Sequence, residues 1–240
     1  MSGGYYIALS GMRARLDQLD RLSEDLANAG TAGFKGERVG SANAPRPVFG
    51  AALETAIDVS LGQRRLDMRQ GTVMPTGRGL DVAVQGNGFL SVQTPSGPRF
   101  TRNGNLLRAA DGSLATSEGG IVLGEGGPIK LGPGTVKIDD DGTVTSGGKV
   151  AGRIQVVGFA DPRLLVREGG ALLRADAPMA PEPLDGPVVK AGVLEQSNVS
   201  VVERMGELTG VARSFQALQK AVSVMMNDVD GRAIDSLGRR

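Results

Sequence analysis

A seven-residue apolar repeat in the last quarter of the chain restricts the possible folds more than any other feature. Within residues 197–230, two positions of the repeat stay apolar for about four heptads, with Arg204 as the polar exception. The apolar positions are Val201, Leu208, Val211, Phe215, Leu218, Val222, Met225 and Val229. A stripe of this length predicts a helix of about 30 residues that packs along a second helix. Ser200 and Glu203 have the spacing of a capping box, which predicts that the helix begins beside Ser200.

A second apolar stripe runs through residues 4–28, in the first part of the chain. Its members are spaced by three or four residues and are interrupted at Ser23. They are Tyr5, Leu9, Met12, Leu16, Leu19 and Leu26. An ordinary amphipathic helix on a globular core would give the same pattern. Because both stripes are long and all other segments lie between them, we expect the two helices to pack against each other.

Residues 80–159, between the stripes, have the pattern of short β-strands separated by glycine-containing turns. Residues 80–84 alternate strictly between apolar and other side chains, and Asn103-Gly104 and Asp111-Gly112 are dipeptides typical of hairpins. This pattern predicts an antiparallel sandwich or a partly open barrel. The predicted fold class is therefore α+β, with long N- and C-terminal helices that pair as a coiled-coil-like unit and a central antiparallel all-β domain.

The same patterns predict how the chain divides into domains. The predicted segments are a terminal helical domain of residues 1–35 and 188–240, an extended connector of residues 36–79, and a central β domain with a proline-rich return in residues 80–187. Within the connector, Met68, Val73 and Met74 are the side chains that could anchor it against another part of the molecule.

The composition excludes several kinds of active site and partner. The chain has no cysteine and no histidine, so it lacks disulfides, thiolate ligands and the usual general base. Its 27 basic and 26 acidic residues nearly cancel, so no global charge indicates a nucleic-acid partner. No run approaches the ~18 apolar residues of a membrane span. No secretory signal pattern is visible, so we expect export, if any, to occur without a cleaved signal peptide.

Two short segments match ligand-binding loops only in part. Residues 147–149 are followed by Val150, where a phosphate loop needs serine or threonine. Residues 139–142 lack the distal glutamate of a calcium-binding loop, so a hairpin turn is the favoured interpretation. We therefore expect a protein that is not an enzyme and has no catalytic, cofactor-binding or metal-binding residues.

Four short blocks occur in order along nearly the whole chain. They read DLANAGTAGFK at residues 25–35, LDVAVQGNGFL at residues 80–90, FTRNGN at residues 100–105 and VLEQSNV at residues 193–199. These blocks resemble the NLANxxTxGFK, LDVAIxGxGFF, YTRxG and LExSNV motifs of the bacterial flagellar rod and hook proteins. Asp25 departs from the pattern, because asparagine is usual there. Each block is short, but together they are specific.

The resemblance implies a structural subunit of the flagellar basal-body rod, the axial drive shaft that crosses the periplasm and transmits torque. It implies assembly with other rod proteins and with further copies of the chain, and export through the flagellar type III apparatus. Within the family, the length and the GVLExSNV wording are most similar to the proximal rod subunits. A distal rod or hook-type paralogue is the alternative.

Two further function classes are weaker. A carbohydrate-binding, fibre-like β module would need exposed aromatic side chains, but the chain has no tryptophan and only two tyrosines. A hydrolase of peptidoglycan would need a pair of carboxylates placed in a cleft, and no spacing in the sequence suggests one.

The residues predicted to form the assembly interface belong to the two apolar stripes. They are Leu9, Met12, Leu16, Leu19, Leu26, Val201, Leu208, Val211, Phe215, Leu218, Val222 and Met225.

Overall fold

The computed structural model describes residues 2–39, 64–176, 178–184 and 189–237, and side chains within residues 9–38, 65–176, 178–184 and 189–224. The chain divides into two compact units. The first unit, here the helical unit, comprises residues 1–26, 39–64 and 200–240. The second, here the β unit, comprises residues 27–38 and 65–199. Among the described residues, no helix combines the length and the hydropathy that a membrane span requires.

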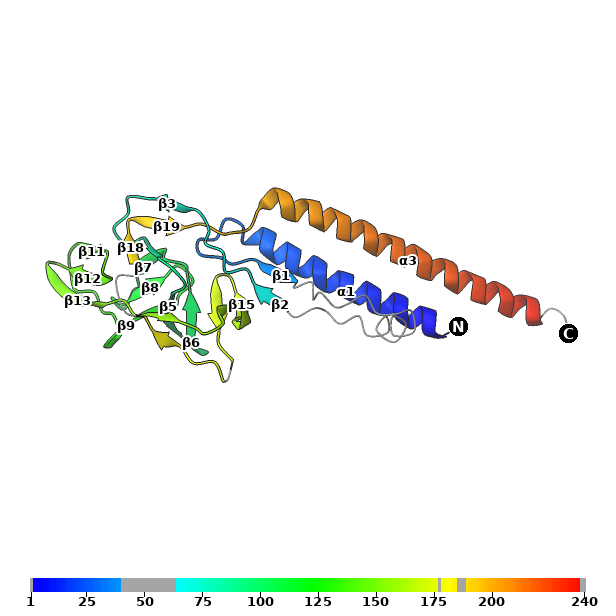
Figure 1. The fold of residues 1–240 in the computed structure, drawn as a ribbon, viewed down its shortest axis with the longest axis horizontal. Helices are drawn as coiled ribbons and strands as arrows, with labels where there is room; N and C mark the ends of the chain where they lie inside the picture. Colours follow the sequence, from blue (N-terminus) through cyan, green and yellow to red (C-terminus); the bar gives the residue numbers. More distant parts are fainter. Residues whose placement is uncertain (1, 40–63, 177, 185–188, 238–240) are drawn as a thin grey trace. The chain divides into compact units, whose positions relative to one another are not determined.

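Two long α-helices form the described part of the helical unit (Figure 1). Helix α1 spans Ser2–Ala27, and helix α3 spans Val201–Leu237, with 37 residues against about 30 predicted. Helix α3 begins where the capping pattern predicts, because the Ser200 hydroxyl accepts a hydrogen bond from the Glu203 backbone N–H at 3.4 Å. This bond satisfies one of the backbone donors that a helix start leaves without an intrahelical partner.

The two helices run antiparallel and are in contact. A Cβ built on Gly11 would lie 3.6 Å from Leu218 Cδ1, and Arg204 Nε lies 3.2 Å from Asp25 Oδ2. From Gly11 to Asp25 the chain advances 14 residues, and from Leu218 to Arg204 it goes back by the same number. The register therefore stays constant over about 21 Å of helix at ~1.5 Å per residue. Halfway between the two contacts, this register places Gln18 opposite Val211, which is buried.

The predicted fold class, an α+β fold whose terminal helices pair as a coiled-coil-like unit, is wrong. The described chain has a large antiparallel β region between two terminal helices, and these helices do not meet through both apolar stripes. The line of α1 that meets α3 holds Gly11, Leu22 and Asp25, none of which belongs to the predicted apolar stripe. Leu9 and Leu16 lie on the opposite side of α1 and are 40% and 45% exposed. A heptad pattern fixes which residues share a face, but it does not fix what that face contacts.

Antiparallel strands form the β unit, and ten of the described strands belong to one sheet. Its longest path follows the order β15-β16-β6-β5-β9-β8-β7, in which β5 is the middle strand. The strand bounds are β1 Glu37–Val39, β2 Arg64–Leu66, β3 Val73–Pro75, β4 Val82–Val84, β5 Phe89–Thr94, β6 Gly97–Thr101, β7 Leu106–Arg108, β8 Leu114–Thr116, β9 Ile121–Gly124, β10 Gly127–Pro128, β11 Val136–Ile138, β12 Thr143–Ser146, β13 Lys149–Arg153, β14 Val156–Gly158, β15 Val166–Gly169, β16 Leu172–Arg174, β17 Glu182–Pro183, β18 Val189–Ala191 and β19 Val193–Glu195. A short 3-10 helix spans Pro162–Leu164.

Two hydrophobic clusters hold the β unit together. The larger consists almost entirely of valine, leucine and isoleucine, as expected for a chain with 3% aromatic residues. Its members include Val82, Val84, Leu90, Val92, Leu106, Leu114, Val122 and Val144. The smaller cluster gathers Phe89, Phe100 and Leu66, with Phe159 packed edge-on against both phenylalanine rings at 5.8 and 4.8 Å.

Two predicted turns are observed as hairpins, and the Gly147-Gly148 pair forms a third. Asp111-Gly112 joins β7 to β8, and the turn at residues 139–142 joins β11 to β12, with the Gly142 N–H bonded to the Asp139 carbonyl at 2.9 Å. Gly147 and Gly148 join β12 to β13 with φ of 56° and 78°, a region that glycine enters without strain. Both the acidic segment and the glycine-rich segment therefore form hairpin turns between paired strands.

The hairpin predicted at Asn103-Gly104 is wrong. The strands on either side, β6 and β7, do not pair with each other; β6 pairs with β5 and β16, and β7 pairs with β8. Gly104 is needed for a different reason, which is close approach to β4. A Cβ at this position would lie 1.7 Å from the Val82 carbonyl oxygen.

The connector is only partly described, because residues 40–63 lie outside the described residues. Its described parts include β1, β2 and β3. Met68 packs against the smaller hydrophobic cluster, as the anchoring prediction requires. Val73 and Met74 are 38% and 51% exposed, so the prediction that they anchor the connector is wrong within the single chain.

Candidate functional site

The four sequence blocks meet at one buried carboxylate in the β unit. Glu195, from the last block, has no exposed surface. One of its carboxylate oxygens accepts hydrogen bonds from Lys35 Nζ at 2.6 Å and from the Gly71 N–H at 3.0 Å, and the other accepts one from Arg102 Nε at 2.8 Å. Lys35 belongs to the first block and Arg102 to the third. We call Glu195, Lys35 and Arg102 the buried charge cluster.

Arg102 joins the second block to the cluster. Its guanidinium donates to three backbone carbonyls, those of Val84, Gly86 and Gly88, at 2.9, 2.7 and 3.0 Å. The carbonyls belong to the last residue of β4 and to the loop that follows it, so the arginine fixes the shape of that loop. Arginine suits this role because its planar group presents five N–H donors in a fixed geometry.

The cluster holds two cations and one anion away from water. Burial lowers the pKa of the Lys35 ammonium, although the hydrogen bond and the charge of Glu195 act in the opposite direction. The ammonium also donates to the Arg69 carbonyl at 2.6 Å, so a backbone dipole helps to solvate it. Because both oxygens of Glu195 are occupied by cationic donors, the carboxylate is a structural anchor, not a general base.

Beside the cluster, the chain segment that follows α1 is bonded to the segment that precedes α3. Gly33 N–H donates to the Glu195 carbonyl at 2.8 Å, and Asn198 N–H donates to the Phe34 carbonyl at 3.4 Å. The Asn198 side chain accepts from the Gly36 N–H at 2.9 Å. We call residues 33–36 and 195–198 together the connector clamp, because they bond the segment that follows α1 to the segment that precedes α3.

Gly33 is required by the clamp geometry. Its φ is 69°, and a Cβ there would lie 2.2 Å from the Arg102 carbonyl carbon. Residues 33–36 therefore lie directly against the backbone of the third block. The Arg167 guanidinium covers the next residue, Phe34, at 4.4 Å from the ring centroid, and donates to the Lys35 carbonyl at 2.6 Å.

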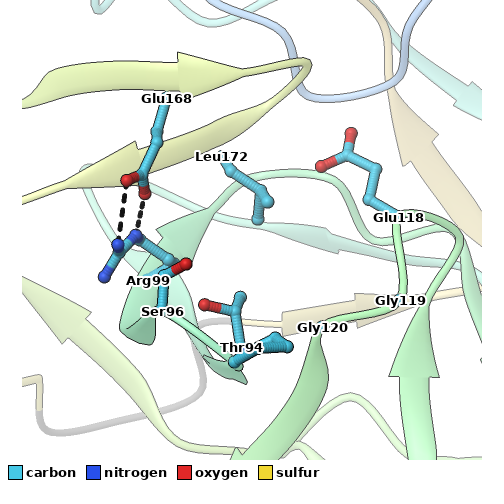
Figure 2. Close-up of a pocket in the computed structure, with 9 residues that line it drawn as sticks. Thr94, Ser96, Arg99, Glu118, Gly119, Gly120, Glu168 and Leu172 are labelled. Carbon is cyan, nitrogen blue, oxygen red and sulfur yellow. Dashed lines mark hydrogen bonds and ion pairs between the residues drawn. The ribbon is translucent and has the colours of Figure 1, made fainter.

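A pocket of about 290 Å³ lies elsewhere in the β unit (Figure 2). Arg99 and Glu168 face each other on one side of it as an ion pair, with Arg99 Nη2 at 2.9 Å from Glu168 Oε1, and Glu118 lies on another side. The fold thus brings two glutamates to one pocket, which the sequence spacing did not indicate. Glu118 accepts hydrogen bonds from the Ala171 N–H at 3.1 Å and from Asn103 Nδ2 at 3.3 Å.

The pocket glutamates are therefore engaged in holding the fold. The hydrogen bond from Arg99 keeps the pKa of Glu168 below its usual value, so this group stays ionised at neutral pH. An inverting or retaining glycosidase needs one carboxylic acid that keeps its proton near neutral pH. Glu168 does not meet that requirement.

The residues predicted as the assembly interface lie in the helical unit with different exposures. On α3, Val211 is buried, Val201 is 45% exposed, and Leu208, Phe215, Leu218 and Val222 are half-buried. On α1, Leu9 and Leu16 are exposed, and Met12, Leu19 and Leu26 are half-buried. The Met225 side chain lies outside the described side chains. The structure brings Leu218 against α1, but it does not bring Leu9 or Leu16 to the line where α1 meets α3.

Gly206 and Gly210 lie open on α3, where a Cβ added to either would meet no atom within 4 Å. No described neighbour within the chain therefore requires glycine at these two positions.

Sequence reasoning missed the three members of the buried charge cluster as contacting residues. Glu195 lies 160 residues from Lys35 and 93 from Arg102, so no local spacing relates them. Of the three, only Glu195 directly follows an apolar pair, Val193-Leu194, where an unpaired charge would be costly to bury.

Comparison with known proteins identifies relatives along the whole chain. Residues 83–146 match the model of the flagellar hook protein FlgE/F/G D1 domain, and residues 190–233 match the model of the flagellar basal body rod FlgEFG protein C-terminal region. The chain is 34% identical to the flagellar basal-body rod protein FlgF of Escherichia coli, with 97% of each chain covered. It is 30% identical to FlgF of Caulobacter vibrioides, covering 100% of this chain and 99% of the relative. FlgG of Bacillus subtilis is 30% identical, with 91% of this chain and 93% of the relative covered.

Proposed function

The chain belongs to the flagellar basal-body rod protein family and is FlgF-like, and on this premise we propose that it is a structural subunit of the rod. One observation carries the proposal, the 34% identity to a FlgF protein over 97% of both chains. The subunit serves as part of the axial drive shaft and contributes by binding its neighbours, not by catalysis.

In this proposal, each of the two compact units has its own structural role. The helical unit supplies the contacts along the rod axis, through the apolar side chains of α1 and α3 that one chain leaves exposed. The connector clamp transmits force between the units, because it ties together the two segments through which the chain passes from one unit to the other.

The partners in this proposal are other rod proteins and further copies of the chain, with binding spread over many contacts in the assembled rod. The chain reaches the rod through the flagellar export apparatus and keeps its N-terminal residues. Mass spectrometry of purified basal bodies should recover peptides from the first turn of α1. A mature N-terminus that begins after α1 would contradict this mode of export.

The experiment that tests the proposal is deletion and complementation in the source bacterium. Cells without the chain should be non-motile and should lack hooks, because a rod that is missing a subunit cannot support distal growth. Expression of the intact chain should restore both, and the chain should copurify with basal bodies. Motile cells with complete rods in the absence of the chain would refute the proposal.

A further inference from the structure

The exceptions to two sequence patterns contact each other in the helical unit. Arg204 is the polar exception in the apolar repeat of α3, and Asp25 stands where the motif of the rod and hook proteins usually has asparagine. In the structure, Arg204 Nε lies 3.2 Å from Asp25 Oδ2. The Asp25 side chain is 2% exposed and the Arg204 side chain is 16% exposed, so the two charges meet at a largely buried point between the helices.

Apolar contacts alone do not fix how α1 is aligned along α3. On the line of α3 that meets α1, Arg204, Val211 and Leu218 follow one another at intervals of seven residues. Val211 and Leu218 are both apolar, so a shift of α1 by one heptad would replace one apolar contact by another of the same kind. A polar residue at a single position of such a seam removes this ambiguity at some cost in stability.

The ion pair distinguishes the observed register from the register shifted by one heptad toward the C-terminal end of α3. Such a shift would move α1 by about 10 Å along α3. Asp25 would then lie opposite Val211, so the buried carboxylate would face an apolar side chain. Separating a buried ion pair is strongly unfavourable, because each charge has already lost its water and gains no replacement. The pair therefore makes the observed register much more favourable than the shifted one.

The chain connection beside α1 is long enough to permit the shift. Residues 28–32 join the end of α1 at Ala27 to the connector clamp, which begins at Gly33. They are folded into a turn, in which the Thr31 N–H donates to the Asn28 carbonyl at 3.0 Å. Because an extended residue advances about 2 Å further than a helical one, straightening this segment gains about 10 Å. The alignment of the helices is therefore not dictated by the length of the connection.

We propose that Asp25 and Arg204 form a register key, an ion pair that selects one alignment of α1 on α3. Glu207, on the same helix as Arg204, contacts the guanidinium at 2.7 Å and helps to hold it toward α1. The key sets the level along α3 at which every side chain of α1 stands, including the exposed ones. This role belongs to the single chain and does not depend on the rod function proposed above.

Disulfide exchange on the purified full chain measures the register, because the natural chain contains no cysteine. Gly11→Cys with Leu218→Cys reports the observed register, since a Cβ at position 11 would lie 3.6 Å from Leu218 Cδ1. Gln18→Cys with Leu218→Cys reports the register shifted by one heptad. Each pair is equilibrated in a glutathione buffer at a protein concentration that excludes contact between copies. The linked fraction then gives the effective concentration of the two thiols.

With Asp25 and Arg204 in place, the effective concentration of the observed-register pair should exceed that of the shifted pair about tenfold or more. Asp25→Leu with Arg204→Leu should bring the two values within about threefold of each other, because leucines pack in either register. Arg204→Lys keeps a cation at this position and should retain most of the preference. Glu207→Gln is the matched control, since it removes a carboxylate that contacts Arg204 from the same helix, and it should leave the preference unchanged.

Two outcomes would overturn the register key. In the first, the double-leucine variant keeps the full preference for the observed register, which would show that the connector clamp or the remaining packing sets the alignment. In the second, the two reporter pairs give equal values in the natural background. Circular dichroism checks that each variant keeps the helix content of the natural chain. If the double-leucine variant loses helix content, Asp25→Asn with Arg204→Gln, a neutral pair of similar size, replaces it with the same expected result.

Discussion

At the scale of single residues, the main feature is a carboxylate that keeps two cations buried. Glu195 has no exposed surface and contacts both Lys35 and Arg102. Replacing a whole buried ion pair by apolar groups is often tolerated, but removing one partner leaves an uncompensated charge. The stability of the β unit is therefore sensitive to a single substitution in the cluster. The presence of the cluster does not mean that its ion pairs stabilise the fold more than apolar side chains would.

Glu195→Gln is expected to lower the free energy of unfolding of the β unit by about 3–5 kcal/mol, because two buried cations then face a neutral amide. Urea denaturation followed by circular dichroism measures the loss. Glu125→Gln is the matched control, since Glu125 is 66% exposed and its contact with Arg153 is 3.5 Å long. The control should cost less than about 0.5 kcal/mol. Equal stabilities of the two variants would refute the anchoring role of Glu195.

Asp67 gives a pH-dependent prediction. Burial tends to raise the pKa of this carboxyl, but hydrogen bonds from Arg69 and the charge of Arg38 at 2.8 Å hold it below the usual 3.8. A lowered folded-state pKa contributes stability that is present above the unfolded-state value and is lost as the pH falls through the folded-state value. Both arginines are more than half exposed, so the contribution is only about 1 kcal/mol.

Asp67→Asn should therefore be less stable than the natural chain at pH 7, and the difference should shrink as the pH drops below about 4. Urea titrations at several pH values between 7 and 2.5 measure the difference. A difference that stays constant over this range would show that the charge of Asp67 is not the cause.

At the scale of elements, the spacing of residues predicts which side chains share one face of a helix or strand. It does not predict which other element packs against that face. The stripe of α1 places Leu9 and Leu16 on one side, as the heptad pattern requires, yet α3 packs on the other side. The turn at Asp111-Gly112 could be predicted because hairpin geometry depends on local backbone torsions. Asn103-Gly104 has the same local signature, but its glycine serves contact with Val82, more than 20 residues away in the chain, and sequence alone does not reveal that contact.

The connector clamp can be tested through two neighbouring glycines. Gly33→Ala should destabilise the β unit by about 2–4 kcal/mol, because it forces a side chain into a φ of 69° and against the Arg102 backbone. Gly30→Ala is the control, since an added Cβ there meets no atom within 4 Å. Thermal unfolding of both variants measures the difference. Similar melting temperatures would mean that the backbone contact at Gly33 relaxes at little cost.

At the scale of the whole molecule, the sequence indicates the family and the kind of each segment, but not the contacts that join segments. The four blocks pointed to rod proteins through residue identity alone, and the full-length relatives confirm this interpretation. The buried charge cluster could not be predicted from spacing, because its charges come from three distant parts of the chain. The exposed face of α1 could not be predicted either, since a pattern of leucines is the same for a face covered within the chain and for one covered by another copy.

The last prediction concerns the order of the two units in the free monomer. Among the described side chains of α1 and α3, Leu22 and Val211 are the buried hydrophobic residues, whereas the β unit has two clusters of them. Most helical stability in proteins comes from packing of an apolar face, and Gly206 and Gly210 lower the intrinsic helix propensity of α3 by about 1 kcal/mol each. We therefore expect the helices of the dilute monomer to open far more often than the β unit.

Hydrogen exchange on the full chain, at concentrations that exclude self-association, measures this difference. Amides within residues 9–26 and 201–224 should exchange at least a hundredfold faster than those of β5 and β6, and they should become protected in assembled rods. The variant Leu16→Asp should leave exchange in the monomer unchanged, because this side chain is 45% exposed there, and should still reduce incorporation into rods. If the amides of the helices are as well protected in the monomer as those of β5, the helical unit is stable before assembly. Its folding then does not depend on a neighbouring copy that covers the exposed leucines.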